Sequence, residues 1–447
     1  MKKLLNLFAV SILALSVVAC STNTDTPVVT GTPDSTNNTE KTVLKVAAIE
    51  TAYGKGPWEA VIDAFEKTVE NVEVELVMDK SLEDVISPSM KAGNFPDVIS
   101  LSLGRPAALT ETFIKDENIR NLDDALQTTI PGEQKTPTDK MAGGFLDNGI
   151  VKPFDESVYL APAFYSPCGL FYNTQLFADN GWTVPTTWDE MWTLADAAKE
   201  KGIALFTYPT TGYYDAFMYS LIYSAGGAEL FNSITNYEEG IWETPEAKEV
   251  IDIVVKLASY THETVPANAN NDNFKKNQAL VLTNEALFMP NGTWVVGEMA
   301  ETPTADGFKW GMTAVPAIKE GSDQYSFTFF EQIWSPKASV NTELANQFIA
   351  FLYSDVAVKE FAKVGAIQPV LGVSDYLDGD NKLFYSIYEN GAKAAMGAWA
   401  ATDAVEGVNI ADSVFGSVNS LVNKTLTKEE YVARIIEASD KLRPALK

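Results

Sequence analysis

The chain has 447 residues, too many for one ordinary hydrophobic core, so we expect two lobes of roughly 150–200 residues each. Its 60 acidic residues against 33 basic ones argue against a nucleic-acid-binding surface, so no nucleic-acid partner is predicted. Its single histidine, His262, argues against a histidine-ligated metal site and a histidine-based catalytic triad, so no metal and no cofactor are predicted.

The N-terminus has the pattern of an export signal. The letters MKK precede an apolar run at residues 4–18, which is too short and wrongly flanked for a membrane span. The letters VVACS at residues 17–21 resemble the bacterial lipobox, in which the cysteine, here Cys20, is acylated and becomes the first mature residue. Cleavage after Ala19 without lipidation is the alternative. Residues 1–19 are therefore predicted to be a lipoprotein signal peptide.

Residues 20–42 are predicted to be a disordered tether, because polar residues and Gly and Pro dominate and almost nothing apolar is present to bury. An acylated Cys20 would anchor this tether to the outer face of the bacterial cell membrane. Cys168 is then left without a disulfide partner, and we expect it to be a buried or half-buried thiol.

Alternating strands and helices follow the tether. A helix opens at Pro57, and strands are predicted at residues 43–49, 72–77 and 96–101. This order implies a parallel sheet, and such sheets bind ligands beyond the carboxyl ends of their strands. The first strand-end loop contains the letters GKG, but it lacks the earlier glycine and the following Ser or Thr of a phosphate loop. Nucleotide binding is therefore not expected.

A pair of helices is predicted within residues 171–202. A short helix from Thr174 ends at Gly181, and a longer helix begins after Thr187, with Glu190 placed to complete a capping box. Gly202 supplies the stop. Helical spacing gives the longer helix one buried face, made of Trp188, Met191, Leu194, Ala195 and Ala198.

The letters FYNTQLFADNGWTVPTTWDE of these helices resemble the signature segment of extracellular solute-binding proteins that deliver sugars to ABC importers, a maltose-binding-protein-like family. The letters PNGTW at residues 290–294 and the stretch 361–370 carry the same resemblance. The resemblance implies an α/β fold with two lobes, of the periplasmic-binding-protein type II, with three hinge crossings and a C-terminal helical region. It also implies a monomer without enzymatic activity that binds carbohydrate and has an ABC permease as partner.

In this family the first crossing between the lobes lies near residues 159–173. The resemblance thus makes Phe164 and Tyr165 candidate ligand contacts, beside the alternative that both rings pack in the core. The strand-end loop that holds Arg105 commonly carries polar residues that reach sugar hydroxyls. Arg105 is therefore a candidate donor, or else it pairs with a surface carboxylate. Trp58 is a candidate aromatic platform.

Tyr213, Tyr214 and Asp215 open an apolar helix at a predicted strand-to-helix junction. A sugar ring offers a face of C–H groups to aromatic rings and offers its edge hydroxyls to a carboxylate. These three residues are therefore the strongest local candidates for ligand binding. The stretch 237–277 is predicted to be a peripheral helical insert with solvated charges.

The remaining candidates come from the resemblance. Trp294 ends the PNGTW phrase and would lie under the ligand, and Trp399 is a candidate stacking ring. Residues 311–316 resemble the strand that returns to the first lobe. Residues 329–336 resemble the third crossing, from which Glu331 would bind sugar hydroxyls. Relatives usually have small residues just before this crossing, whereas this chain has large rings that could narrow the cleft or pack beneath it: Phe327, Phe329 and Phe330.

Together these patterns predict a lipid-anchored, exported binding component of an ABC importer that closes on a neutral mono- or oligosaccharide by hinge motion. The permease would open the lobes and release the solute. The predicted boundaries are residues 43–162 and 310–332 for the N-terminal lobe, and 163–309 and 333–447 for the C-terminal lobe.

Two alternatives stay open at this point. A surface glycoside hydrolase also has aromatic rings and carboxylates in a cleft, and needs two carboxyls about 5–10 Å apart, but no catalytic phrase is recognisable. The acidic balance also allows a binding protein for a cationic ligand, such as a polyamine or a basic peptide. The affinity for such a ligand would fall with salt.

Overall fold

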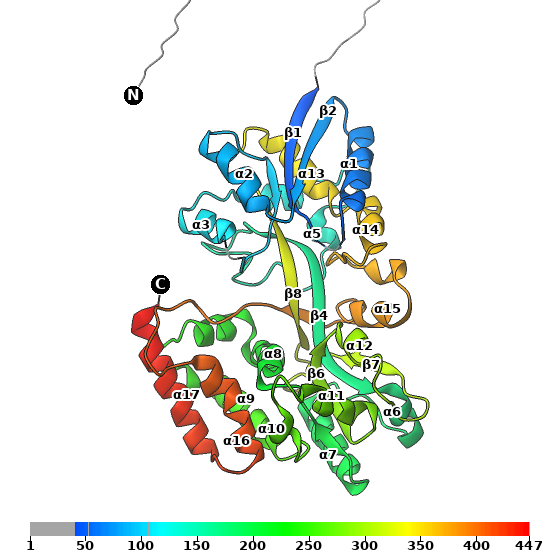
Figure 1. The fold of residues 1–447 in the computed structure, drawn as a ribbon, viewed down its shortest axis with the longest axis vertical. Coiled ribbons are helices and arrows are strands. Elements are labelled where there is room, and N and C mark those ends of the chain that lie inside the picture. Colours follow the sequence, from blue (N-terminus) through cyan, green and yellow to red (C-terminus); the bar gives the residue numbers. More distant parts are fainter. Residues whose placement is uncertain (1–40, 52, 106, 447) are drawn as a thin grey trace, which may run out of the picture. The chain divides into compact units, whose positions relative to one another are not determined.

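In the computed structural model, which describes residues 41–446 except residues 52 and 106, one sheet of nine strands connects two lobes (Figure 1). The predicted signal peptide, Cys20 and nearly all of the predicted tether lie outside the described residues. The strands are β1 (Thr42–Ile49), β2 (Val72–Asp79), β3 (Val98–Ser100), β4 (Ala161–Asn173), β5 (Ala204–Phe206), β6 (Ala286–Gly292), β7 (Trp310–Thr313), β8 (Tyr325–Trp334) and β9 (Lys393–Ala395). Their order is β2–β1–β3–β8–β4–β6–β5, with β7 paired to β4 and β9 paired to β8.

Helices pack around this sheet in both lobes (Figure 1). The α-helices are α1 (Gly56–Thr68), α2 (Leu82–Lys91), α3 (Leu109–Lys115), α4 (Asp123–Gln127), α5 (Pro137–Lys140), α6 (Thr174–Asn180), α7 (Trp188–Glu200), α8 (Tyr214–Thr235), α9 (Pro245–Ala258), α10 (Val265–Asn268), α11 (Phe274–Leu282), α12 (Val295–Glu298), α13 (Thr342–Phe351), α14 (Asp355–Ala362), α15 (Gly379–Tyr385), α16 (Val418–Val422) and α17 (Lys428–Leu442). Short 3-10 or π turns are η1 (Thr211–Tyr213), η2 (Ile241–Glu243), η3 (Val373–Tyr376), η4 (Asp412–Gly416) and η5 (Arg443–Ala445). Within the described part of the chain, no helix has the length and apolarity that crossing a membrane requires.

The first lobe contains the parallel sheet that the alternating pattern predicted. β1 pairs in parallel with β2 and with β3. Val46 and Ala48 of β1 are buried in one cluster with α1, whereas Ala47 and Ile49 are buried in another with α2. Because successive side chains of a strand point to opposite faces, β1 needs a helix on each side.

The second lobe is built on the C-terminal half of β4. β6 pairs antiparallel with β4 from Cys168 to Phe171, and β5 lies parallel to β6. β6 is buried along its whole length, and α8 is buried from Phe217 to Ser224. An apolar helix beside an apolar strand gives this lobe its core.

The predicted pair of helices within residues 171–202 is confirmed as α6 and α7. α6 ends at Gly181 in the left-handed conformation, with φ of 65°. At the start of α7, Thr187 and Glu190 form the predicted capping box in both directions. The buried face of α7 consists of Trp188, Met191, Leu194, Ala195 and Ala198, as helical spacing predicted.

One predicted lobe boundary is wrong because α13 and α14 pack on α1 in the first lobe. The ring of Phe65 in α1 lies 5.0 Å from the ring of Phe348 in α13. The ring of Trp58, also in α1, lies 5.3 Å from that of Phe361 in α14. Residues 333–447 are therefore not all in the C-terminal lobe, since the apolar faces of these two helices complete the core of the first.

The assignment of residues 310–332 to the N-terminal lobe is wrong for β7. This strand pairs antiparallel with the end of β4, at Leu170 to Asn173, and so it lies in the second lobe. β8 is the strand that returns, because its last residues, Ile333 and Trp334, pair with β3. β4 and β8 thus connect the lobes, and β9 of a later segment pairs with β8.

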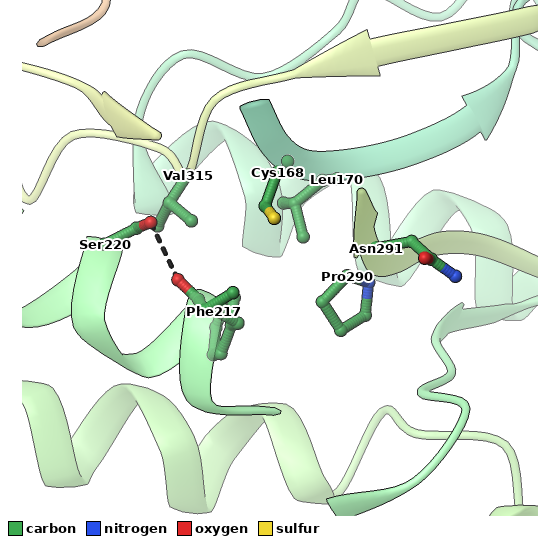
Figure 2. A pocket seen from close by; sticks show the side chains of 9 residues that line it. Cys168, Leu170, Phe217, Ser220, Pro290, Asn291 and Val315 are labelled. Atoms are coloured by element: carbon green, nitrogen blue, oxygen red, sulfur yellow. Dashed lines mark hydrogen bonds between the residues drawn. The ribbon is translucent and has the colours of Figure 1, made fainter. Parts of the chain in front are cut away.

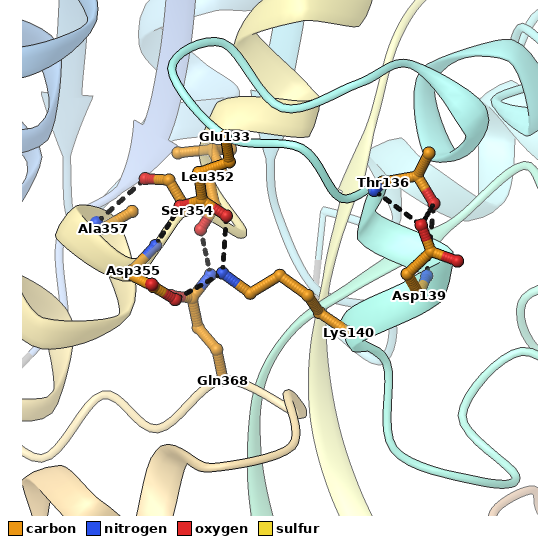
Figure 3. A network of polar contacts seen from close by, with 9 residues as sticks. All are labelled: Glu133, Thr136, Asp139, Lys140, Leu352, Ser354, Asp355, Ala357 and Gln368. Atoms are coloured by element: carbon orange, nitrogen blue, oxygen red, sulfur yellow. Dashed lines mark hydrogen bonds and ion pairs between the residues drawn. The ribbon is translucent and has the colours of Figure 1, made fainter.

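A buried lysine also links the start of α14 to the part of the first lobe around α5 (Figure 3). Lys140 of α5 is 7% exposed, and its ammonium lies 3.1 Å from Glu133 and 2.7 Å from Asp355 at the start of α14. The backbone amide of Asp355 donates to the other oxygen of Glu133. Most of the lysine is withdrawn from water, so both carboxylates are needed to compensate its charge.

Lys140→Met is expected to lower the free energy of unfolding by about 1–3 kcal/mol, because it removes two ion pairs and leaves Glu133 without its cation. Lys363→Met is the matched control, since Lys363 is exposed and, among the described residues, forms its ion pair with Glu360, three positions earlier. That control is expected to cost less than about 1 kcal/mol. Urea unfolding of both variants measures their free energies of unfolding. Equal decreases in the two variants would contradict a stabilising role for the ion pairs of Lys140.

Candidate functional site

A cavity of about 210 Å³ lies where β4, β6, β8 and the start of α8 meet. It is lined by Cys168, Thr210, Gly212, Tyr213, Asp215, Ala216, Asn291, Trp294 and Phe329. Three of the predicted ligand-binding residues, Tyr213, Asp215 and Trp294, are therefore brought together from distant parts of the sequence. We take this cavity as the candidate site.

At the turn before α8, some side chains point into the core and others line the cavity. Thr210 caps η1 by accepting a hydrogen bond of 3.2 Å from the amide of Gly212. Tyr214 then points into the core, where its ring lies 5.3 Å from that of Tyr208. Because neighbouring residues of a helical turn point in different directions, Tyr213 and Asp215 on either side line the cavity.

Gly292 allows Trp294 to lie across the end of β6. A Cβ atom on Gly292 would be only 2.0 Å from the indole ring, so no other residue fits without moving that ring. Trp294 remains 40% exposed. In the PNGTW phrase, Gly292 thus leaves room for the ring of Trp294, which lies at the surface.

Three aromatic rings form one wall of the cavity. The ring of Trp294 lies 6.4 Å from that of Tyr213 and 6.0 Å from that of Phe329. Phe329 is 52% exposed, which is unusual for so large an apolar side chain. Exposed rings in mutual contact offer a flat apolar surface to a ligand.

Asp215 supplies a carboxylate beside these rings. Burial raises its pKa to about 6, although a hydrogen bond from the amide of Ala216 favours the charged form. No lysine or arginine of the described residues forms an ion pair with Asp215. Its oxygens are therefore available to polar groups of a ligand.

Asn291 adds a donor to the same lining. Its Oδ1 accepts a hydrogen bond of 2.9 Å from the amide of Gly292, which fixes the orientation of the side-chain amide. Its Nδ2 is buried and has no hydrogen-bond partner among the residues that the structure describes. A buried donor without a partner is costly, which favours a ligand acceptor at this position.

A second carboxylate, Glu331, lies further along β8. Burial raises its pKa to about 7, and no described residue donates a hydrogen bond to its side chain. Burial and the nearby charge of Glu331 raise the pKa of Tyr53 to about 12. Tyr53 belongs to the loop after β1, so these two residues bring a loop of the first lobe close to a crossing strand.

The other predicted site residues do not line the cavity. Trp58 and Phe164 are each 4% exposed, and both rings pack against Phe361. Tyr165 is 5% exposed and its hydroxyl donates to the carbonyl of Tyr385. The prediction that Trp58 and Tyr214 stack on a ligand is wrong, because other rings cover them. For Phe164 and Tyr165 the structure favours the alternative of core packing.

Two further candidates have protein partners. The guanidinium of Arg105 forms a double hydrogen bond with Glu83, so it pairs with a carboxylate as the alternative held, but with a buried one and not with a surface one. That pair holds the pKa of Glu83 below its ordinary value. The ring of Trp399 stacks on that of Tyr237 at 5.7 Å with an interplanar angle of 11°. One face of Trp399 is therefore already covered.

Sequence reasoning did not select Thr210, Asn291 or Tyr53 as site residues, and it left the role of Phe329 open. Asn291 lies inside a phrase that drew attention only to its tryptophan. The sequence left open whether the rings near the third crossing narrow the cleft or pack beneath it. Phe327 is 6% exposed and packs beneath the site, whereas Phe329 lines the cavity and narrows it. Nothing in the local pattern distinguishes these two residues, because both lie on the same side of β8.

A larger cavity, about 530 Å³, lies between the C-terminal end of α6 and α7, but it suits a ligand less well. Of its two carboxylates, Asp189 and Glu190, the second already accepts the backbone amides of Thr186 and Thr187. Its ring, Trp182, faces the ammonium of Lys201 at 5.9 Å. Among the described residues, no cluster of three or more His, Cys, Asp or Glu side chains could hold a metal ion.

A family model and curated relatives both match this chain. A model of the family described as "Bacterial extracellular solute-binding protein" matches residues 60–378. A diacetylchitobiose binding protein of Streptomyces coelicolor is 26% identical over 278 residues, and a multiple sugar-binding protein of Streptococcus mutans is 25% identical over 276 residues. These matches cover 62% and 59% of this chain, and the chain spans only 57% and 59% of those relatives.

A solved structure of another protein has the same fold. The structure of the sugar-binding protein MalE from Xanthomonas citri superimposes with a TM-score of 0.60 at 15% identity, covering 90% of this chain and 98% of that one. The predicted two-lobe α/β fold is thus confirmed.

Glu331→Gln is expected to stabilise the protein increasingly as the pH rises from about 4.5 to 8. Below the ordinary pKa of 4.5 both states keep the proton; between 4.5 and about 7 only the folded state keeps it, so stability falls with pH. Above 7 the buried charge costs about 3 kcal/mol, which the neutral amide avoids.

Melting temperatures across this pH range test the effect, with Glu73→Gln as the control because Glu73 is exposed on β2. A constant difference between Glu331→Gln and the parent at all pH values would contradict the assignment.

Proposed function

Because the chain belongs to the family of bacterial extracellular solute-binding proteins, we propose that it captures a neutral mono- or oligosaccharide and delivers it to an ABC importer. The observation that carries this proposal is the wall formed by Tyr213, Trp294 and Phe329 beside the carboxylate of Asp215. Rings match the C–H face of a sugar, and a carboxylate accepts its hydroxyls. Relatives named for sugar binding support the same ligand class.

The lobes close on the ligand by bending the strands that join them. β4 pairs with β8 from Ala161 to Pro167, but the register of this pairing shifts between Pro162 and Tyr165. Such an irregularity interrupts the ladder and provides a place to bend. Closure brings the first lobe, through Tyr53 and Glu331, to a sugar already held against Trp294.

The protein acts outside the cell, held to the outer face of the cell membrane by lipid on Cys20. The tether at residues 20–42 lets a monomer turn between solute capture and docking on the permease. The permease then opens the lobes and the solute leaves. Radiolabelling with palmitate tests the anchor, which Cys20→Ala would abolish.

Two competing functions make different predictions. A hydrolase would use Asp215 and Glu331, whose raised pKa values suit proton transfer, and purified protein would release reducing sugar. A receptor for a cationic ligand would use Asp215 among the three rings, and its affinity would fall with salt. Sugar binding without hydrolysis and with little salt dependence separates the proposed function from both.

A thermal-shift screen of the tether-free protein against mono- and oligosaccharides is expected to show one responding sugar series. A ligand that binds only the folded state raises the melting temperature with the logarithm of its concentration. Polyamines and basic peptides form the contrast set. A response to cations alone would overturn the sugar assignment.

Trp294→Ala and Asp215→Asn are each expected to weaken binding of the responding sugar by about 10- to 100-fold, since each removes one kind of contact. Trp192→Ala is the control, because Trp192 is a half-buried ring of α7 that stacks on Tyr260 away from the cavity. Titration calorimetry gives the affinities. Unchanged affinity in both site variants would show that the ligand binds elsewhere.

A further inference from the structure

A second, much smaller cavity adjoins the candidate site (Figure 2). It holds about 10 Å³ and shares Cys168, Ala216 and Asn291 with the larger cavity. Its other lining residues are Gly169, Leu170, Phe217, Ser220, Pro290 and Val315. We call this cavity the notch. It extends the candidate site toward the core of the second lobe.

The notch is apolar in character. Leu170, Phe217 and Val315 are each at most 2% exposed. The hydroxyl of Ser220 is engaged, because it donates a hydrogen bond of 2.8 Å to the carbonyl of Ala216. Burial raises the pKa of the Cys168 thiol, which therefore stays neutral and behaves as a small apolar group.

Neither a water molecule nor a sugar hydroxyl is well placed in the notch. A buried water needs at least two polar partners, and the notch offers little beyond Asn291, because the hydroxyl of Ser220 is engaged. A hydroxyl would lose its hydrogen bonds to solvent without replacement. A single methyl group loses nothing on entering and gains apolar contact.

Polar groups flank the entrance to the notch. Asn291 lies beside Pro290 (Figure 2) and lines both cavities, and its Nδ2 has no partner within the described chain. On the side of α8, the carboxylate of Asp215 precedes Ala216, which also lines both cavities. An amide donor and a carboxylate acceptor thus lie next to an apolar recess.

We propose, on the basis of the function proposed above, that the ligand is a sugar with an N-acetyl substituent, such as a 2-acetamido sugar. The acetamido group has three parts that match the three features of the site. Its methyl fills the notch, its carbonyl accepts a hydrogen bond from Asn291, and its N–H donates to Asp215. A hydroxyl at the same ring position has a single oxygen for both polar partners and leaves the notch empty.

Titration calorimetry with two matched β-1,4-linked disaccharides tests this proposal. The dimer of N-acetylglucosamine and cellobiose differ only in the substituent at the 2-position. The acetylated sugar is expected to bind at least tenfold more tightly, from one buried methyl and one additional hydrogen bond. Equal or tighter binding of cellobiose would overturn the proposal while the sugar-binding function stands. Failure of both sugars and of the wider panel would overturn that function as well.

Ser220→Val adds bulk to the notch and is expected to reduce the preference for the acetylated sugar about fivefold or more, with cellobiose affinity changed less than twofold. Ser224→Val is the matched control, since Ser224 lies one turn further along α8, is also buried, and does not line the notch. A preference that survives in Ser220→Val would show that the methyl lies elsewhere. If Ser220→Val does not fold, the affinities of the two disaccharides for the parent protein still test whether the acetylated sugar is preferred.

Discussion

The pairing of β4 with β8 is the constraint on which the rest of the structure depends. β4 pairs through Ala161 and Pro162 with the end of β8 that reaches β3, and its other end carries β6 and β7. One strand of 13 residues is therefore shared by both lobes. The candidate site lies along this pair, so any bending of the strands changes which groups of the first lobe reach a bound ligand.

The candidate site lies where the buried elements β4, β6, β8 and α8 meet a cavity. Rings and carboxylates in such a place cost stability, because apolar surface meets water and charge is withdrawn from it. Phe329 and Trp294 are exposed, and burial raises the pKa values of Asp215 and Glu331. A ligand that covers the rings and satisfies the carboxylates recovers this cost, which is how a receptor gains affinity from a destabilised site.

The sequence predicted what depends on neighbours along the chain. The capping box of Thr187 and Glu190 and the buried face of α7 follow from bonds and spacings within a few residues. The lobe boundaries failed because they depend on pairing across the chain, as between β7 and β4, and on which core accepts α13 and α14. The site was predicted only in part: of the predicted residues, Tyr213, Asp215 and Trp294 line the cavity. Trp58 and Tyr214 do not, because only the packed fold decides which of several rings is covered.

The most direct test is a crystal structure of the tether-free protein with a bound disaccharide. The account predicts a sugar ring against Trp294, with a polar group of the sugar about 2.6–3.2 Å from the carboxylate of Asp215. A sugar bound between α6 and α7, or anywhere that leaves Trp294 and Asp215 free, would contradict it.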